Sequence, residues 1–181
     1  MISITEHYGI KVLRDDILEG GTKSILMPFL VGDQKEYVYA SPVYGGFQIA
    51  LSSYCNKVGK KATIFCAQRK ELHANTKRCL NAGAKVIQVP HGYLSVVEKR
   101  ARDYCEKTGA TKLKFGAKTD QNIFLISNRM SEIIKELRYE PDEIWCAIGS
   151  GMLVEGILSG TTKAKVYGVQ VGAEYTNAHE R

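Results

Sequence analysis

Lys61-Ala62-Thr63-Ile64-Phe65-Cys66-Ala67 is the stretch that decides the fold class, because it is apolar along almost its whole length. A nearly continuous apolar run of this kind is typical of a strand in a sheet that is covered on both faces. Helices are predicted on either side of it, over residues 49–55 and 72–81, and further strands over residues 36–40 and 85–89. The run therefore predicts an inner strand of an α/β domain.

The same alternation of strand and helix continues in both directions along the chain. Such alternation implies βαβ crossovers and a mostly parallel sheet. We therefore expect an α/β fold with a mostly parallel open sheet and helices on both of its faces. The remaining strands are predicted over residues 9–13, 112–115, 143–148 and 165–171, and the remaining helices over residues 24–31, 93–108, 123–138 and 152–158.

The composition is that of an ordinary globular chain. Of its 181 residues, 44% are hydrophobic and 24% are charged, which excludes a disordered chain and predicts one domain, or one with a small appendage. The net charge of +6 is spread along the chain without a long block of like charges. Solvated helix faces explain this charge, while attraction of phosphates, other anions or nucleic acid stays open.

The cysteines and the lengths of the apolar runs indicate the compartment. The five cysteines are widely and irregularly spaced, with no CxxC and no Cys/His ligand pattern, so we expect free thiols, a reducing interior and no metal site. No apolar run approaches the roughly 18 residues of a membrane-spanning helix. We therefore expect a cytoplasmic protein without a membrane partner.

Leu18-Glu19-Gly20-Gly21-Thr22-Lys23-Ser24 places a lysine just after two glycines and just before an apolar run. Adjacent glycines allow a positive φ and a close approach to a ligand, so a tight turn here delivers the amine into an interior space. Burial disfavours the ammonium form and lowers the pKa of a lysine. Lys23 is thus a candidate nucleophile toward an aldehyde. The alternative is an ordinary Gly-Gly turn followed by a solvated lysine.

Gly149-Ser150-Gly151-Met152-Leu153 follows a predicted strand and opens a predicted helix. Clustered backbone N–H groups and the positive end of the helix dipole suit a phosphate there, and Ser150 adds a hydroxyl donor. The segment has neither the Gly-Lys-Ser/Thr of a Walker loop nor the spacing of the dinucleotide fingerprint. The alternative is a plain strand-to-helix turn that needs glycine for steric reasons.

Ser41-Pro42-Val43-Tyr44-Gly45-Gly46-Phe47-Gln48 also leaves a strand and enters a helix. Its hydroxyl groups, its backbone N–H groups and the Gln48 amide suit a substrate carboxylate or a ring oxygen; the alternative is a turn with a surface tyrosine. Ligands of open parallel sheets bind beyond the carboxyl ends of the strands. The glycine-bearing segments 20–23, 41–48 and 149–156 all fall at or near such ends, so we expect them to share one pocket.

In their order and spacing these segments resemble the fold type II, or tryptophan synthase β-like, family of pyridoxal-phosphate enzymes, over roughly residues 11–175. No single motif is specific. The Gly20-Gly21-Thr22-Lys23 version is most similar to the branch that contains 1-aminocyclopropane-1-carboxylate deaminase and D-cysteine desulfhydrase. The resemblance implies a small lobe around residues 41–115, or 40–115 as a domain, inserted in a larger lobe of residues 1–39 and 116–181.

The resemblance also implies a role for each segment. Lys23 would hold pyridoxal 5'-phosphate as an internal aldimine and, once displaced by the substrate amine, would move protons at the α or β carbon. The reaction would be an elimination or deamination of a small amino acid, which makes the protein a lyase or deaminase. The cofactor phosphate would contact Gly149, Ser150, Gly151, Met152 and Leu153, and the substrate side would be lined by Ser41, Tyr44, Gly45, Gly46 and Gln48.

The chain departs from the family pattern in two residues and in length. Tyr44 stands nearest to the position of an asparagine that bonds the ring hydroxyl, and Met152 stands where Gly or Thr is usual. Family chains are much longer, so we expect a version shortened at the C-terminus whose exposed apolar surface is covered in a homo-oligomer such as a dimer. The alternatives are a non-catalytic or partner-dependent relative, and an enzyme acting on a nucleotide-linked or nucleic-acid-linked amine.

Overall fold

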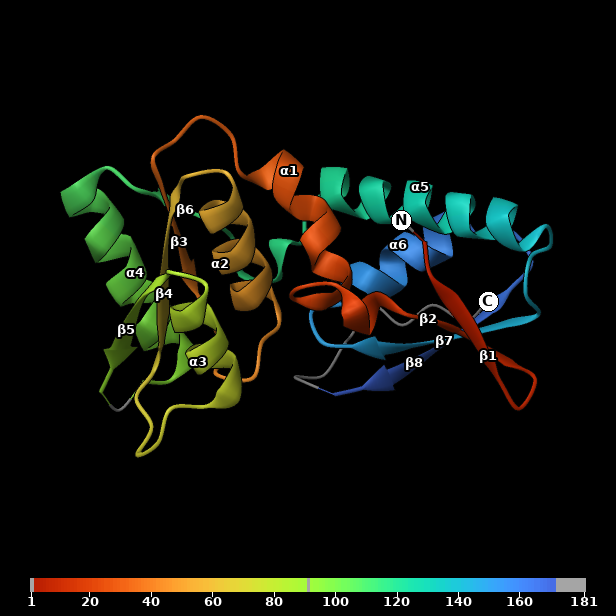
Figure 1. The fold of residues 1–181 in the computed structure, drawn as a ribbon, viewed down its shortest axis with the longest axis horizontal. Coiled ribbons are helices and arrows are strands. Elements are labelled where there is room, and N and C mark those ends of the chain that lie inside the picture. The colour runs from red at the N-terminus through yellow and green to blue at the C-terminus, as the bar shows by residue number, and fades with distance from the viewer. Residues whose placement is uncertain (1, 91, 172–181) are drawn as a thin grey trace. The chain divides into compact units, whose positions relative to one another are not determined.

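The computed structural model describes residues 2–90 and 92–171, and the chain forms two compact units, Met1–Phe115 and Gly116–Arg181 (Figure 1). The first unit contains β1 (Ile4–His7), β2 (Ile10–Leu13), the 3-10 helices η1 (Asp15–Ile17) and η2 (Gly21–Leu26), α1 (Met27–Leu30), β3 (Glu36–Ala40), α2 (Phe47–Lys57), β4 (Lys61–Ala67), α3 (Ala74–Asn81), β5 (Lys85–Val89), α4 (Leu94–Thr108) and β6 (Thr111–Lys112). The 3-10 helix η3 (Phe115–Ala117) lies at the boundary, and the second unit contains α5 (Asp120–Leu137), β7 (Glu143–Ile148), α6 (Met152–Gly160) and β8 (Lys165–Gln170).

Four parallel strands, in the order β5-β4-β3-β6, form the main sheet of the first unit. β3 and β4 pair with Val38 opposite Thr63. Parallel neighbours require a crossover connection, and the chain supplies α2 between β3 and β4 and α3 between β4 and β5. The predicted α/β fold with a mostly parallel sheet is confirmed. The antiparallel pair β1–β2 forms a separate hairpin.

Helices cover both faces of this sheet, as the apolar run of β4 predicts. The face toward α4 carries a buried cluster made of Val38, Ala40, Phe65, Val89, Val97 and Ala101. On the opposite face the ring of Tyr39 lies 4.5 Å from the ring of Phe47, at the start of α2. Figure 1 shows α4 on one side of the strands and α2 with α3 on the other.

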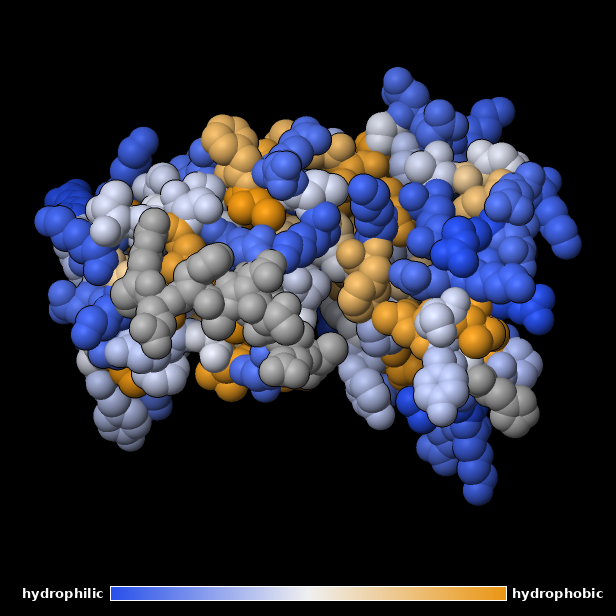
Figure 2. All heavy atoms as spheres, turned by 180° about the vertical axis from the view of Figure 1, so that it is seen from behind, coloured by the Kyte–Doolittle hydropathy of each residue, from blue (hydrophilic) through white to orange (hydrophobic). Residues whose placement is uncertain are grey.

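The second unit pairs β7 and β8 in parallel and packs α5 against α6. Glycine makes this helix contact possible, because a Cβ on Gly156 would lie 2.4 Å from Cγ2 of Ile126, and one on Gly160 would lie 2.6 Å from the Ser127 carbonyl oxygen. Gly156 therefore serves helix packing. The sheet leaves apolar side chains uncovered within this unit, since Trp145 is 64% and Val169 is 51% exposed. Figure 2 shows hydrophobic residues exposed between hydrophilic ones on the face drawn there.

The structure confirms the strands over residues 36–40, 61–67, 85–89 and 143–148 with the predicted bounds. The predicted helix over residues 24–31 is wrong in type: a 3-10 helix starts at Gly21, and only Met27–Leu30 are α-helical. Its start follows the left-handed backbone of Gly20, which sets a tight turn in place of a regular first helical turn.

Two boundaries near residue 115 also differ from the prediction. The strand predicted over residues 112–115 is only Thr111–Lys112, because Gly116 takes a left-handed φ of +68° and turns the chain into η3. α5 begins at Asp120, ahead of the predicted residue 123, because the Thr119 side chain accepts a hydrogen bond from the Asn122 N–H and caps the helix. Within the described ranges no helix is long and apolar enough to span a membrane. The grouping of residues 1–39 with 116–181 around a lobe of residues 40–115 stays a prediction.

Candidate functional site

The turn before Lys23 is fixed by two glycines with left-handed backbones, φ +91° at Gly20 and φ +74° at Gly21. Gly20 also lies against the first turn of α2, where a Cβ would come within 2.4 Å of the Ala50 backbone nitrogen. Any side chain at this position would have to displace backbone. The sequence therefore needs glycine here both for conformation and for space.

This turn places Lys23 on η2 with a half-buried side chain. Its Nζ lies 5.8 Å from the centroid of the Phe47 ring. Burial lowers the pKa of the Lys23 amine from its ordinary value of 10.5, because the charged form loses solvation. The prediction that the turn brings this amine into partly apolar surroundings is confirmed, and the picture of a fully solvated lysine is wrong.

The segment 41–48 is an ordered loop held from inside by one buried amide. Nε2 of Gln48 donates to the carbonyl oxygens of Pro42, Val43 and Gly45, at 3.2, 3.0 and 2.9 Å. The Gln48 side chain is fully buried, and its Oε1 has no hydrogen-bond partner among the described residues. The Gln48 amide therefore shapes the loop from inside through its NH₂ group.

Ser41 and Gly45 belong to the same turn. The Ser41 N–H donates to the Phe65 carbonyl at 2.8 Å, its Oγ donates to the Pro42 carbonyl at 2.9 Å, and the Gly45 N–H donates to the same carbonyl at 2.9 Å. A Cβ on Gly45 would lie 3.1 Å from the Ser41 Oγ. Ser41 is buried, so its hydroxyl contributes to the shape of the loop at the carboxyl end of β3.

The lysine turn and the 41–48 loop lie against each other within the first unit. A Cβ on Gly46 would lie 3.2 Å from the Gly20 carbonyl oxygen, and η2 packs against α2. Phe47, beneath the Lys23 amine, is the first residue of α2. The structure thus brings the predicted catalytic lysine and the predicted substrate loop together.

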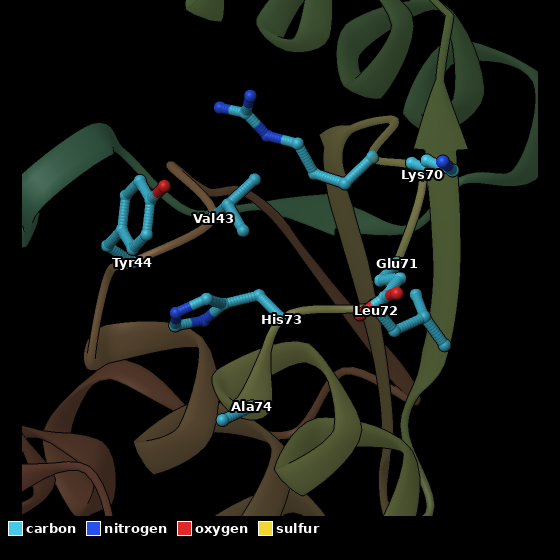
Figure 3. Close-up of a pocket in the computed structure, with 8 residues that line it drawn as sticks. Val43, Tyr44, Lys70, Glu71, Leu72, His73 and Ala74 are labelled. Carbon is cyan, nitrogen blue, oxygen red and sulfur yellow. The ribbon is translucent and has the colours of Figure 1, made fainter.

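Tyr44 points away from this contact and toward α3. Its side chain is 69% exposed, and its ring meets the His73 ring edge-on at 4.7 Å between centroids. The Tyr44 carbonyl accepts a hydrogen bond from Nδ2 of Asn75 at 3.0 Å. Tyr44 and Val43 form one side of a pocket of about 510 Å³ whose other residues are Arg69, Lys70, Glu71, Leu72, His73 and Ala74 (Figure 3).

The predicted phosphate turn lies in the second unit, between β7 and α6. Gly151 is the N-cap of α6 and has a left-handed φ of +84°, and its carbonyl accepts the Glu155 N–H at 3.1 Å. Gly116 leaves room for the Ser150 side chain, because a Cβ on Gly116 would lie 2.7 Å from the Ser150 Cβ. Just behind the turn, Nζ of Lys118 forms an ion pair with Glu155 at 2.7 Å.

This turn fits a phosphate group. The first turn of a helix leaves its N–H groups without intrahelical acceptors, and the glycine at the N-cap offers no side chain to satisfy them. The space around Gly149 is open, with nothing within 4 Å of where its Cβ would lie. The Met152 side chain is buried, so Met152 and Leu153 would contact an anion through their backbone N–H groups.

Sequence reasoning missed the 69–74 segment and Phe47. The segment follows the carboxyl end of β4, which is where ligands of parallel sheets bind. It contains the cations Arg69 and Lys70 and the imidazole of His73. The His73 Nδ1 accepts the Asn75 N–H at 3.2 Å and caps α3. Phe47 gave no sequence signal, because its place beneath the lysine depends on the contact of η2 with α2. In the described ranges, no cluster of three His, Cys, Asp or Glu side chains is placed to hold a metal ion.

Comparison with known proteins adds the family. The sequence profile of the family described as pyridoxal-phosphate dependent enzyme matches residues 21–180. This chain belongs to the pyridoxal-phosphate dependent enzyme family. The matched residues include Lys23, the 41–48 loop and the 149–153 turn. The match confirms the predicted family and its cofactor, pyridoxal 5'-phosphate. A comparison with curated proteins gives no match.

Solved structures of similar fold agree with this assignment. O-ureido-L-serine synthase has a TM-score of 0.74 at 16% identity, over 93% of this chain and 59% of that one. A hydrogen sulfide-producing enzyme from Fusobacterium nucleatum has a TM-score of 0.72 at 15% identity, over 88% and 57%. The threonine deaminase of T.th. has a TM-score of 0.66 at 16% identity, over 84% and 50%. At these identities the similarity shows the fold, and this chain spans little more than half the length of these proteins.

Proposed function

We propose that the protein is a pyridoxal-phosphate-dependent lyase or deaminase that acts on a small amino acid, with Lys23 as the residue that holds the cofactor. The observation that carries this proposal is the half-buried Lys23 amine, whose pKa is lowered by burial and which lies against the 41–48 loop. A lysine with a lowered pKa has more of the neutral amine needed to attack an aldehyde.

Two sets of residues would hold the cofactor. Lys23 would bind its aldehyde carbon, and the N–H groups of Gly149, Ser150, Gly151, Met152 and Leu153 would bind its phosphate, aided by the dipole of α6. When bound, pyridoxal phosphate supplies an electron sink for the carbanion at the substrate α carbon. Gln48 would act on the substrate side by fixing the loop, because its buried amide NH₂ is bonded to loop carbonyls.

The 41–48 loop would bind the substrate carboxylate with backbone donors. The hydroxyl of Ser41 and the N–H of Gly45 already donate to the Pro42 carbonyl. The N–H groups of Tyr44 and Gly46 have no acceptor in the part of the chain that the structure describes. Gly46 is the N-cap of α2, whose first turn adds further donors. These donors suit an anion of the size of a carboxylate.

Lys23 would also move the proton. With cofactor and substrate bound, the Lys23 amine would be the group that accepts a proton from the substrate α carbon and returns it at the α or β carbon. Burial lowers the pKa of the Lys23 amine, which increases the fraction of the neutral, proton-accepting form relative to a solvated lysine. The Phe47 ring, whose centroid lies 5.8 Å from Nζ, provides an apolar surface on one side of the amine.

The proposed substrate and reaction are supported by the local sequence and by similar folds. Gly20-Gly21-Thr22-Lys23 supports a place near 1-aminocyclopropane-1-carboxylate deaminase and D-cysteine desulfhydrase. Threonine deaminase and diaminopropionate ammonia lyase from Escherichia coli, both of similar fold, support ammonia release from an amino acid. We propose a cytoplasmic homo-oligomer, because the five cysteines are free and the exposed Trp145 and Val169 offer an apolar face for a second copy.

The test is the visible absorbance of the purified protein after addition of pyridoxal phosphate and dialysis. Wild-type protein should retain the absorbance of lysine-bound cofactor, Lys23→Ala should lose it, and Lys99→Ala, an exposed lysine on α4, should keep it. Amino acids that react would then shift the spectrum and release ammonia. Wild-type protein that stays colourless would defeat the proposal and favour a non-catalytic or partner-dependent relative.

A further inference from the structure

The pocket beside the 41–48 loop has no role in the cofactor site as described above. It lies where the carboxyl end of β4 leads into α3, and it is bounded by Val43 and Tyr44 on one side and by residues 69–74 on the other (Figure 3). It is a hollow of about 510 Å³ that is largely open to solvent, so a ligand would bind there with one side exposed. A small amino-acid side chain would fill only a minor part of it.

The walls of the pocket are tied together and to the lysine turn. Nδ2 of Asn75 donates to the Tyr44 carbonyl at 3.0 Å, and the Arg69 N–H donates to Oε1 of Gln88 on β5 at 3.2 Å. Arg78 of α3 pairs with Glu19, the residue before Gly20, at 2.9 Å. The pocket is therefore a fixed neighbour of the segments that carry the proposed substrate loop and Lys23.

One end of the pocket presents an aromatic surface. The Tyr44 ring is largely exposed and is held edge-on against the His73 ring, as Figure 3 shows for the two labelled side chains. The His73 ring is itself fixed, because its Nδ1 caps α3. An exposed tyrosine whose ring edge is in contact with a neighbouring ring still offers a stacking face to a planar ligand.

The same pocket carries surplus positive charge. Arg69 and Lys70 are exposed, and neither forms an ion pair with any residue in the ranges 2–90 and 92–171. Glu71 supplies the single carboxylate of the lining, so one positive charge remains. Unpaired cations beside an aromatic face match a ligand that combines a ring with an anionic group.

We propose that this pocket binds the distal part of an elongated amine substrate, made of a planar ring and a phosphate or carboxylate group. The ring stacks on Tyr44 and the anion contacts Arg69 and Lys70. The inference rests on the proposed function, since the amino group of the same substrate would react at the Lys23 cofactor. It narrows the substrate class from small amino acids to amines with a ring-bearing anionic extension, such as an aryl phosphate amino acid or an amine attached to a nucleotide.

The binding test uses probes without a reactive amine, so that it is independent of the cofactor chemistry. Phenyl phosphate, inorganic phosphate and phenol are titrated by calorimetry into the full chain saturated with pyridoxal phosphate. Phenyl phosphate should bind about tenfold more tightly than either fragment, because it makes both contacts. Adenosine 5'-monophosphate and N-acetyl-O-phospho-L-tyrosine, neither of which has a reactive amine, then compare a nucleotide with an aryl phosphate amino acid, and tight binding of either one supports the proposal.

Matched variants separate the two contacts. Arg69→Gln/Lys70→Gln should weaken phenyl phosphate and inorganic phosphate about tenfold, whereas Tyr44→Ala should weaken phenyl phosphate about tenfold and leave inorganic phosphate unchanged. Lys99→Gln/Arg100→Gln removes an equivalent pair of adjacent exposed cations from α4 and should change nothing. Equal weakening by the α4 pair, or phenyl phosphate binding no better than phosphate, overturns the proposal.

The two proposals fail in different ways. A protein that keeps bound cofactor but binds phenyl phosphate no better than phosphate refutes the pocket assignment and leaves the enzyme assignment intact. A colourless protein whose phenyl phosphate affinity depends on Tyr44 and Arg69 refutes the enzyme assignment and with it the link to an amine, although the pocket then binds the ring and anion alone.

Discussion

Gly20 and Ala50 approach so closely that a Cβ on Gly20 would lie 2.4 Å from the Ala50 backbone nitrogen. This contact joins the turn before Lys23 to the first turn of α2, and so to the loop proposed to bind the substrate. Gly20 also has a φ of +91°. The position of Lys23 therefore requires glycine at residue 20 for two reasons, the close packing against Ala50 and the left-handed backbone. The position of the lysine turn is thus set by backbone packing.

Gly20→Ala should therefore destabilise the first unit and displace Lys23. The left-handed backbone costs a side chain about 1–2 kcal/mol, and displacing Ala50 should bring the total to about 3 kcal/mol. Gly21→Ala is the matched control, because φ is +74° there but nothing lies within 4 Å of the Cβ position. Urea unfolding measures both variants, and equal losses would contradict the packing argument. Gly20→Ala should also lose cofactor absorbance at concentrations where Gly21→Ala retains it.

Gln48→Leu should loosen the substrate loop. Removing the amide leaves the carbonyls of Val43 and Gly45 without this donor, whereas the Pro42 carbonyl keeps the Ser41 hydroxyl and the Gly45 N–H. The loss should cost about 2–3 kcal/mol. Gln68→Leu, at an exposed position after β4, should cost less than about 0.5 kcal/mol. Urea midpoints of the two variants give the comparison. If both variants shift the midpoint equally, Gln48 does not hold the loop.

The fold was predictable where local pattern and tertiary structure agree. The apolar run Lys61–Ala67 is buried on both faces in the way that its sequence indicates, and the turn at Gly20-Gly21 does place Lys23 where burial lowers its pKa. The predicted helix over residues 24–31 failed, because the apolar run carries no sign that a left-handed Gly20 starts a 3-10 helix.

Contacts between distant segments could not be predicted from spacing. Gln48 looks like a substrate ligand because of its residue type, yet its NH₂ is used by three loop carbonyls. Phe47 lies near the Lys23 amine only because η2 packs on α2. The pocket at residues 69–74 depends on Tyr44, which is distant along the chain and is held near α3 by Asn75. The family, by contrast, was predictable from the order of the glycine-bearing segments, and the family profile matches residues 21–180.

Glu140 should make the second unit sensitive to acid. Its carboxylate accepts the backbone N–H groups of Lys163 and Ala164 and both donors of Thr162. These hydrogen bonds, of which the one from the Lys163 N–H has the largest effect, lower the pKa of Glu140 from 4.5 to about 2. A lowered pKa means that the stabilisation is fully present above pH 4.5 and is lost as the pH falls toward 2. Glu140→Gln should flatten this dependence.

The measurement for Glu140 is urea unfolding at several pH values between about 7 and 2. Between about pH 5 and pH 2 the free energy of unfolding should fall more for the wild-type protein than for Glu140→Gln. Above about pH 5 it should change with pH in nearly the same way for both proteins. Glu143→Gln, on β7, is the control, since its carboxylate contacts the Trp145 side chain and no backbone N–H that the structure describes. A Glu140→Gln variant with an unchanged acid profile would show that the loop before β8 does not depend on this carboxylate.

Cys55 and Cys79 should resist alkylation in the native protein. Burial raises the pKa of both thiols to about 11, from an ordinary value of 9.0. At about pH 8 this lowers the reactive thiolate about a hundredfold, in addition to the steric shielding of buried sulfur. Iodoacetamide labelling followed by peptide mass spectrometry should find both cysteines unmodified in native protein and modified in urea. Cys105 and Cys146 are half-buried and should label before the buried cysteines, so that prompt labelling of Cys79 would contradict its burial on α3.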